Sequence, residues 1–211
     1  MEEFYQMLRS CNLNLYQGKG PFPRWLLKYT EPVIPKSFKI LHQILKNECR
    51  SSRIVEIGAG AGDVTAFLIQ EGFLNIHSYE RDTYLGQLAN EKISCLFGKI
   101  DIVSCQEFSI NTYDDADILL LYNCIYWESW MKKKDFCKKL VSFYKHANRP
   151  HVYIIEVPDA EYMISEEVFP RFTWISTSDM REMFPGKKIS SFISYQRLDL
   201  GITKRIYRIC R

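Results

Sequence analysis

Three closely spaced glycines are the first feature of this sequence that could do chemistry. Gly58, Gly60 and Gly62 lie in the stretch 54–63, IVEIGAGAGD, and an apolar run follows them. The β-branched residues that precede the glycines are typical of a parallel strand buried on both faces. Because glycine lets the backbone turn sharply and approach a ligand closely, the pattern predicts a strand, a ligand-binding turn and a helix.

The spacing of the glycines and the acids around them bear on the kind of ligand. A dinucleotide-binding turn needs glycine at its first, third and sixth positions, and the sixth position here is Asp63. Glu56 and Asp63 bracket the turn and would repel the phosphates that such turns hold at a helix N-terminus. A cationic ligand without phosphate therefore fits this turn better than a dinucleotide.

A second acid, Glu80, directly follows the apolar-leaning stretch 74–79. In dinucleotide folds, an acid about 20 residues after the first glycine accepts hydrogen bonds from ribose hydroxyls. The alternative is that Glu80 complements the dipole of a helix that begins near residue 83. Asp82 suits that second role better, so we assign Glu80 to a ribose.

The strand, turn and helix resemble motif I of class I S-adenosylmethionine (SAM) methyltransferases, which cradle the methionine end of SAM. The resemblance implies SAM as the cofactor, Glu56 as the acid of motif I, and Glu80 as the ribose ligand. Gln106 stands where the family commonly has Asp against the adenine, and an amide can both donate and accept hydrogen bonds. An exposed polar loop is the alternative for Gln106 and its neighbour Glu107. The cofactor contacts implied by the resemblance are Glu56, Gly58, Ala59, Gly60, Gly62, Glu80, Arg81, Gln106, Glu107 and Asn123.

Strands and helices are expected to alternate through most of the chain. The expected strands are 53–57, 74–79, 100–104, 116–122 and 151–157, and the expected helices are 63–71, 83–94, 131–147 and about 178–183. Such alternation predicts a doubly wound, mostly parallel α/β sheet. Two β-rich runs, 187–198 and 202–210, predict an antiparallel C-terminal hairpin, with which the family completes a seven-stranded sheet.

Two segments are expected to surround the methyl acceptor. Ligands of open α/β sheets bind at the carboxyl ends of the strands, where Asn123, Tyr126 and Glu156 follow or end expected strands. Asn123 and Tyr126 resemble the Asn-x-x-Tyr pattern of amine-methylating relatives, without its proline. We expect these three residues to position the acceptor, and we expect the aromatic residues Tyr16, Trp25, Tyr29 and Trp127 to line its pocket. Packing against neighbouring helices, or for Glu156 an ion pair with Arg or Lys, is the alternative.

The N-terminal segment 1–35 differs from the rest because it contains four prolines and many aromatic residues. We expect it to form a helical cap on a methyltransferase domain at 36–211. A helix is expected to begin at Lys36, with Phe38, Leu41, Leu45 and Cys49 on one face.

Composition bears on the number of domains, on membrane association and on disulfide or metal sites. The chain has 211 residues, of which 46% are apolar, and its net charge is +3; this predicts one main core. No apolar run approaches the length of a membrane span and no signal pattern begins the chain, so we expect a cytoplasmic protein that does not bind membranes. The odd number of cysteines and the scattered histidines predict neither disulfides nor a metal site.

These observations predict a SAM-dependent methyltransferase that acts on nitrogen or oxygen of a small-molecule or peptide acceptor. An RNA-modifying enzyme is the first alternative. It would use Lys132–Lys134, Lys138 and Lys139, which otherwise form a solvated helix face. A SAM-fold partner protein without catalysis is the second. The oligomeric state is not indicated by the sequence.

Overall fold

The computed structural model describes residues 1–19, 22, 24–99, 101–106, 108, 115–122, 131–161, 174–197, 199 and 201–211. Its strands form one seven-stranded sheet in the order β3-β2-β1-β4-β5-β7-β6. The strands are β1 (Arg53–Ile57), β2 (Asn75–Tyr79), β3 (Val103–Ser104), β4 (Ile118–Leu121), β5 (Val152–Pro158), β6 (Lys188–Arg197) and β7 (Ile202–Cys210). The first five are parallel, and β7 runs antiparallel to both β5 and β6. The predicted fold class, with its C-terminal hairpin, is confirmed.

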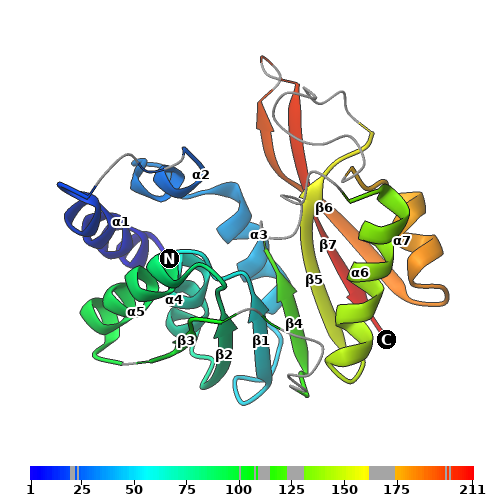
Figure 1. Ribbon diagram of the computed structural model, residues 1–211, viewed down its shortest axis with the longest axis horizontal. Coiled ribbons are helices and arrows are strands. Elements are labelled where there is room, and N and C mark those ends of the chain that lie inside the picture. The colour runs from blue at the N-terminus through cyan, green and yellow to red at the C-terminus, as the bar shows by residue number, and fades with distance from the viewer. Residues whose placement is uncertain are drawn as a thin grey trace.

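Helices cover both faces of this sheet (Figure 1). They are α1 (Glu2–Tyr16), α2 (Arg24–Leu27), the 3-10 turn η1 (Lys28–Thr30), α3 (Lys36–Leu45), α4 (Asp63–Gln70), α5 (Thr83–Phe97), α6 (Lys133–His146) and α7 (Thr177–Met183). One apolar cluster packs side chains of α1, α3 and α4 against the sheet, and a second packs α6 and α7 against the opposite face. The predicted helical N-terminal segment is therefore present, and Phe4, Tyr5 and Leu8 of α1 belong to the first cluster.

Most predicted element boundaries agree with the structure to within a few residues, with two clear differences. The strand expected at 100–104 is only Val103–Ser104, because it pairs with β2 alone over two residues. The helix from Lys36 ends at Leu45, so Cys49 lies beyond it and is exposed. The expectation that Cys49 shares the buried face of that helix is wrong.

Strand alternation decides which side chains meet at the functional edge. Successive residues of a strand point to opposite faces, so Glu56, Tyr122 and Glu156 share the face that carries the first cluster, together with Ile54, Leu120 and Ile154. The parallel strands β1, β2, β4 and β5 all end at the same edge of the sheet. Polar residues that the sequence spreads over a hundred positions are thereby brought to one edge.

Candidate cofactor and acceptor site

The glycine turn connects β1 to α4 at the edge where the parallel strands end. Gly58, Gly60 and Gly62 all have positive φ, at 75°, 56° and 77°. A Cβ added at Gly62 would lie 2.7 Å from the Cβ of Ala89 in α5, so a side chain there would need the helix to move. The backbone N–H groups of Gly58 and Ala59 donate to the carbonyl of Tyr79, which ties the turn to the end of β2. The tight backbone predicted from the three glycines is confirmed.

Glu80 lies directly beside this turn. Its Oε2 accepts a hydrogen bond from the backbone N–H of Gly60 at 2.7 Å, and its Oε1 accepts one from the N–H of Asp82 at 2.9 Å. Asp82 instead caps α5, because its side chain accepts hydrogen bonds from the N–H groups of Tyr84 and Leu85. Asp82 therefore has the capping role expected for it, and the ribose role of Glu80 stays a prediction. An ionised carboxylate has further lone pairs, which leaves Glu80 able to accept hydrogen bonds from a diol.

Glu56 lies beneath the turn and is almost fully buried. Its Oε2 accepts hydrogen bonds from the hydroxyls of Thr65 and Ser78 at 2.6 and 2.7 Å. These bonds connect β1 to α4 and to β2. Burial raises the pKa of Glu56 to about 7, although the two hydroxyls oppose the shift. The direct contact between Glu56 and the cofactor that the family resemblance implies stays a prediction.

Asp63 has a different environment from the one that its sequence position indicated. Its Oδ1 accepts hydrogen bonds from Nδ2 of Asn12 in α1 and from Nζ of Lys92 in α5, both at 2.8 Å, in the protein interior. Its charge is thus balanced by Lys92. Of the two acids named in the electrostatic argument against a pyrophosphate, Asp63 therefore no longer counts, whereas Glu56 lies beneath the turn, and Glu80 is a further acid that contacts it.

At the part of the site where the adenine is expected, the structure describes Arg81 and Gln106. Arg81 follows β2 and Gln106 follows β3, and both side chains are exposed. Since β2 and β3 are neighbours in the sheet, the two residues lie at the same edge. Glu107 lies outside the described residues. Contacts from Arg81, Gln106 and Glu107 to the cofactor remain predictions.

The expected acceptor edge is formed by the ends of β4 and β5. Asn123, Tyr126 and Trp127 lie outside the described residues, which end here at Tyr122. Because Leu121 pairs with Ile155, Tyr122 lies level with Glu156. Glu156 is buried, and among the described parts of the chain its Oε2 has no hydrogen-bond partner. A buried oxygen without a partner is costly, so this atom is suited to accept a hydrogen bond from a ligand.

The neighbouring acid Asp159 has the structural role that was considered for Glu156. Arg205 of β7 donates to Asp159 Oδ2 from its Nε and forms an ion pair with it through Nη2, both at 2.7 Å. Glu161 takes a further contact from the same guanidinium at 3.2 Å. Asp159 is therefore committed to the sheet edge, whereas no arginine of the described residues forms an ion pair or hydrogen bond with Glu156.

The N-terminal aromatic residues reach two different places. Tyr16 packs in a small cluster with Leu26, Ala61 and Leu88, and thus against the glycine turn and α5. Tyr29 is buried against Phe38, at 5.2 Å between ring centroids, and approaches Tyr122 through its neighbour Lys28. The side chain of Trp25 lies outside the described part of the molecule. Of the expected pocket residues, Tyr29 is at the acceptor edge and Tyr16 is at the turn.

Three functional candidates were missed at the sequence level, namely Asn12, Lys28 and Lys92. Lys92 carried a usable signal, because it stands at helical spacing between Leu88 and Leu96 and so on an apolar helix face. The segment around Lys28 has no such periodicity. Only the contacts made after folding identify Lys28 and Asn12.

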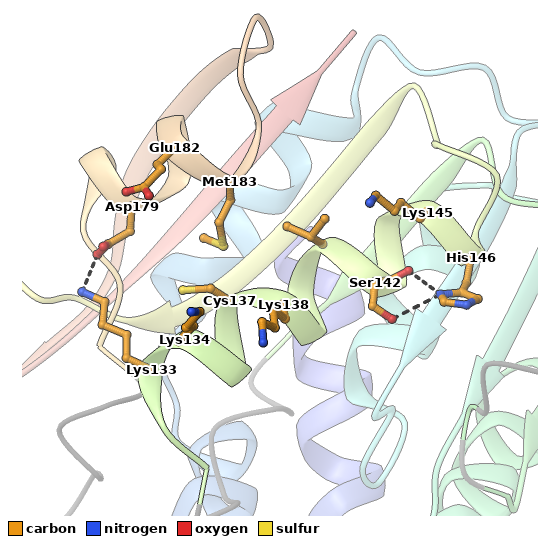
Figure 2. Close-up of a pocket in the computed structure, with 11 residues that line it drawn as sticks. Lys133, Lys134, Cys137, Lys138, Ser142, Lys145, His146, Asp179, Glu182 and Met183 are labelled. Carbon is orange, nitrogen blue, oxygen red and sulfur yellow. Dashed lines mark hydrogen bonds and ion pairs between the residues drawn. The ribbon is translucent and has the colours of Figure 1, made fainter.

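A groove of about 770 Å³ lies between α6 and α7, on the other face of the sheet. Figure 2 shows lysines of α6 on one wall and Asp179 and Glu182 of α7 on the other. Lys133 and Asp179 form an ion pair at 2.8 Å. The groove therefore contains both signs of charge.

Within the described residues, no group of three or more His, Cys, Asp or Glu side chains is arranged to hold a metal ion. No helix in the described part of the chain is long and apolar enough to span a bilayer.

No protein-family model and no curated protein matches the sequence. Solved structures nevertheless share the fold. Magnesium protoporphyrin IX methyltransferase from Synechocystis PCC 6803, with bound S-adenosylhomocysteine (SAH), aligns with a TM-score of 0.64 at 13% identity, over 94% of this chain and 91% of that one. A putative O-methyltransferase from Klebsiella pneumoniae gives 0.62 at 15% identity, over 97% and 90%. The methyltransferase domain of a bacterial Hen1 gives 0.58 at 13% identity, over 83% and 97%. The chain has the fold of the class I SAM-dependent methyltransferases.

Proposed function

We propose that this protein is a SAM-dependent methyltransferase that transfers a methyl group to nitrogen or oxygen of a small-molecule or peptide acceptor. The observation that carries the proposal is the contact between Glu80 and the N–H of Gly60 at the ends of β1 and β2. This contact supports the proposal because it sets a carboxylate with spare lone pairs beside the glycine turn. SAM would supply an electrophilic methyl group on a sulfonium.

Different residues of this chain would then bind the different parts of SAM and the acceptor. The glycine turn would hold the methionine end and Glu80 the ribose hydroxyls, with Gln106 and Glu107 toward the adenine. Buried Glu56 fixes the first strand to α4 beneath the turn. At the acceptor edge, Asn123, Tyr126 and Glu156 would orient the nucleophile, while Tyr16, Trp25, Tyr29 and Trp127 would shield it from water. Alignment and exclusion of water are the main requirements for such a displacement.

Calorimetric titration with SAM and with SAH tests the proposal directly. We expect saturable binding of both, with one molecule bound per chain. Undetectable binding of both at high protein concentration would contradict an enzymatic role and favour the alternative of a partner protein that uses the fold without catalysis. A cytoplasmic location is part of the same proposal.

RNA modification remains the second candidate, and the lysines of the groove between α6 and α7 are the observation in its favour. Against it, Asp179 and Glu182 share that groove and Lys133 is already paired. Titration of an RNA oligonucleotide at several salt concentrations separates the two candidates, because neutralising several phosphates makes affinity fall steeply with salt. A weak response that does not change with salt would exclude the RNA candidate.

A further inference from the structure

The ammonium group of Lys28 lies between two tyrosine rings at the acceptor edge. Its Nζ donates a hydrogen bond to the hydroxyl of Tyr122 at 3.2 Å, and it is 4.6 Å and 4.9 Å from the ring centroids of Tyr29 and Tyr122. Both tyrosines are buried. Aromatic faces at this distance attract organic cations, and more strongly where water is excluded.

A carboxylate completes this arrangement from the sheet. Glu156, which is 2% exposed, lies level with Tyr122 on the neighbouring strand. Burial by itself would lower the pKa of Lys28, but the Tyr122 hydroxyl, which accepts its hydrogen bond, and the Glu156 carboxylate outweigh burial and raise it. The Glu156 carboxylate also favours the charged form of Lys204 in β7, but burial outweighs this effect and lowers the pKa of Lys204 to about 8. Lys28 is thus held as a cation.

We infer that Tyr29, Tyr122 and Glu156 form a binding site for an organic ammonium group, which Lys28 fills in this structure, and that an amine acceptor enters by displacing Lys28. The inference rests on the proposed function, since it names the acceptor of that reaction as a cationic amine. Lys28 and Tyr29 both belong to η1, so Lys28 leaves by rotation of its own side chain while the backbone of η1 and the ring of Tyr29 stay in place.

An amine bound in this way must lose a proton before it can be methylated. The proton passes to the Glu156 carboxylate, which leaves a neutral amine with a lone pair. That lone pair forms the N–C bond while the C–S bond of the sulfonium donor breaks, and both electrons of the broken bond stay on sulfur. Glu156 is suited to this transfer because its Oε2 has no hydrogen-bond partner within the described residues.

The position of the site in the sheet distinguishes the acceptor from the donor. SAM itself carries an ammonium group, but the glycine turn and Glu80 lie at the ends of β1 and β2. The ammonium site lies at β4 and β5, on the other side of β1 in the strand order (Figure 1). We therefore assign it to the acceptor.

The test uses n-butylammonium, which has the four carbons and the ammonium group of a lysine side chain, and the variant Lys28→Ala, which lacks that ammonium group and three of the carbons. We expect this variant to bind n-butylammonium saturably at millimolar concentration, seen as a rise in its unfolding temperature and as shifts of tyrosine NMR signals. Wild type should bind it at least about tenfold more weakly, because only molecules that have released Lys28 offer the site. Lys39→Ala, at an exposed lysine of α3, is the matched control and should behave as wild type.

Three results would overturn the inference. They are the absence of saturable binding to Lys28→Ala, equal binding by the Lys28→Ala, Glu156→Gln double variant, and equal binding of uncharged n-butanol. The titration of wild type, followed through the side-chain signal of Lys28, covers the case in which the alanine variant does not fold. That signal must move as n-butylammonium displaces the side chain, and a fixed signal would count against the site.

Repeating the titration with saturating SAH separates the possible occupants. Unchanged binding of n-butylammonium supports an acceptor site, whereas competition by SAH would assign the site to the amino group of the donor and overturn the inference. The two proposals can fail separately. Binding of n-butylammonium without SAH binding would reject the methyltransferase, and the reverse pattern would reject the ammonium site alone.

Discussion

The ammonium of Lys92 lies 2.8 Å from the carboxylate of Asp63, and neither side chain is open to solvent. Lys92 belongs to α5, and Asp63 is the first residue of α4, directly after the glycine turn. Asn12 of α1 donates to the same carboxylate oxygen, and Lys92 also donates to the hydroxyl of Tyr16. Burial lowers the pKa of Lys92. This pair therefore links the N-terminal segment, the turn and α5 through groups that are costly to leave unpaired.

Removing one member of the pair should destabilise the protein strongly. We expect Lys92→Met to lower the free energy of unfolding by about 3–5 kcal/mol, because it leaves a buried carboxylate without its cation. Urea unfolding measures the effect. Lys19→Ala is the matched control, since the exposed pair of Lys19 with Glu91 also joins the N-terminal segment to α5. It should cost less than about 1 kcal/mol, and similar losses in both variants would contradict the structural role of the buried pair.

Two glycine substitutions separate backbone strain from steric contact. Gly62→Ala combines a positive φ with a Cβ that would lie 2.7 Å from Ala89, whereas Gly98→Ala has a positive φ and no atom within 4 Å. We expect Gly98→Ala to cost about 1 kcal/mol and Gly62→Ala about 2–4 kcal/mol in unfolding free energy. Thermal or urea unfolding compares them. Equal losses would mean that α5 moves freely away from the turn.

Glu80→Ala should weaken SAM binding by about 1–3 kcal/mol, because the ribose hydroxyls and the N–H of Gly60 lose their shared acceptor. Calorimetry gives the dissociation constant. Glu91→Ala, at an exposed acid of α5, should leave it unchanged. An unaltered dissociation constant in Glu80→Ala would disprove the ribose assignment.

The buried Glu56 should make stability depend on pH. Its pKa is about 7 in the folded protein against an ordinary value of 4.5. The folded state therefore holds this proton more tightly than the unfolded state. The resulting stabilisation is fully present below pH 4.5 and is lost as the pH rises through 7.

Between these limits we expect wild type to lose up to about 3 kcal/mol relative to Glu56→Gln. Urea unfolding of both proteins from pH 5 to pH 8 (about the range in which an acid with this shift titrates) measures the difference. Parallel stability curves for the two proteins would show that Glu56 titrates normally.

Local patterns were sufficient for the elements and for the cofactor turn. The three glycines and the β-branched run before them predict β1, the turn and α4, because turn geometry and strand burial depend on neighbouring residues. Capping is equally local, so Asp82 was correctly distinguished from Glu80. The end of α3, which leaves Cys49 outside the helix, and the length of β3 were predicted wrongly. The end of an element depends on which other segments pack or pair with it.

The amino-acid sequence by itself determined the α/β class, the glycine turn and the acid that contacts it, since each follows from residue types at short and fixed spacings. Only the tertiary structure decided how charges are paired. It placed Lys92 on Asp63, Arg205 on Asp159, and Lys28 between the rings of Tyr29 and Tyr122. Apart from Lys28 and its neighbour Tyr29, these partners are far apart along the chain, and their meeting depends on sheet order, strand register and the packing of the N-terminal segment, which no local pattern encodes.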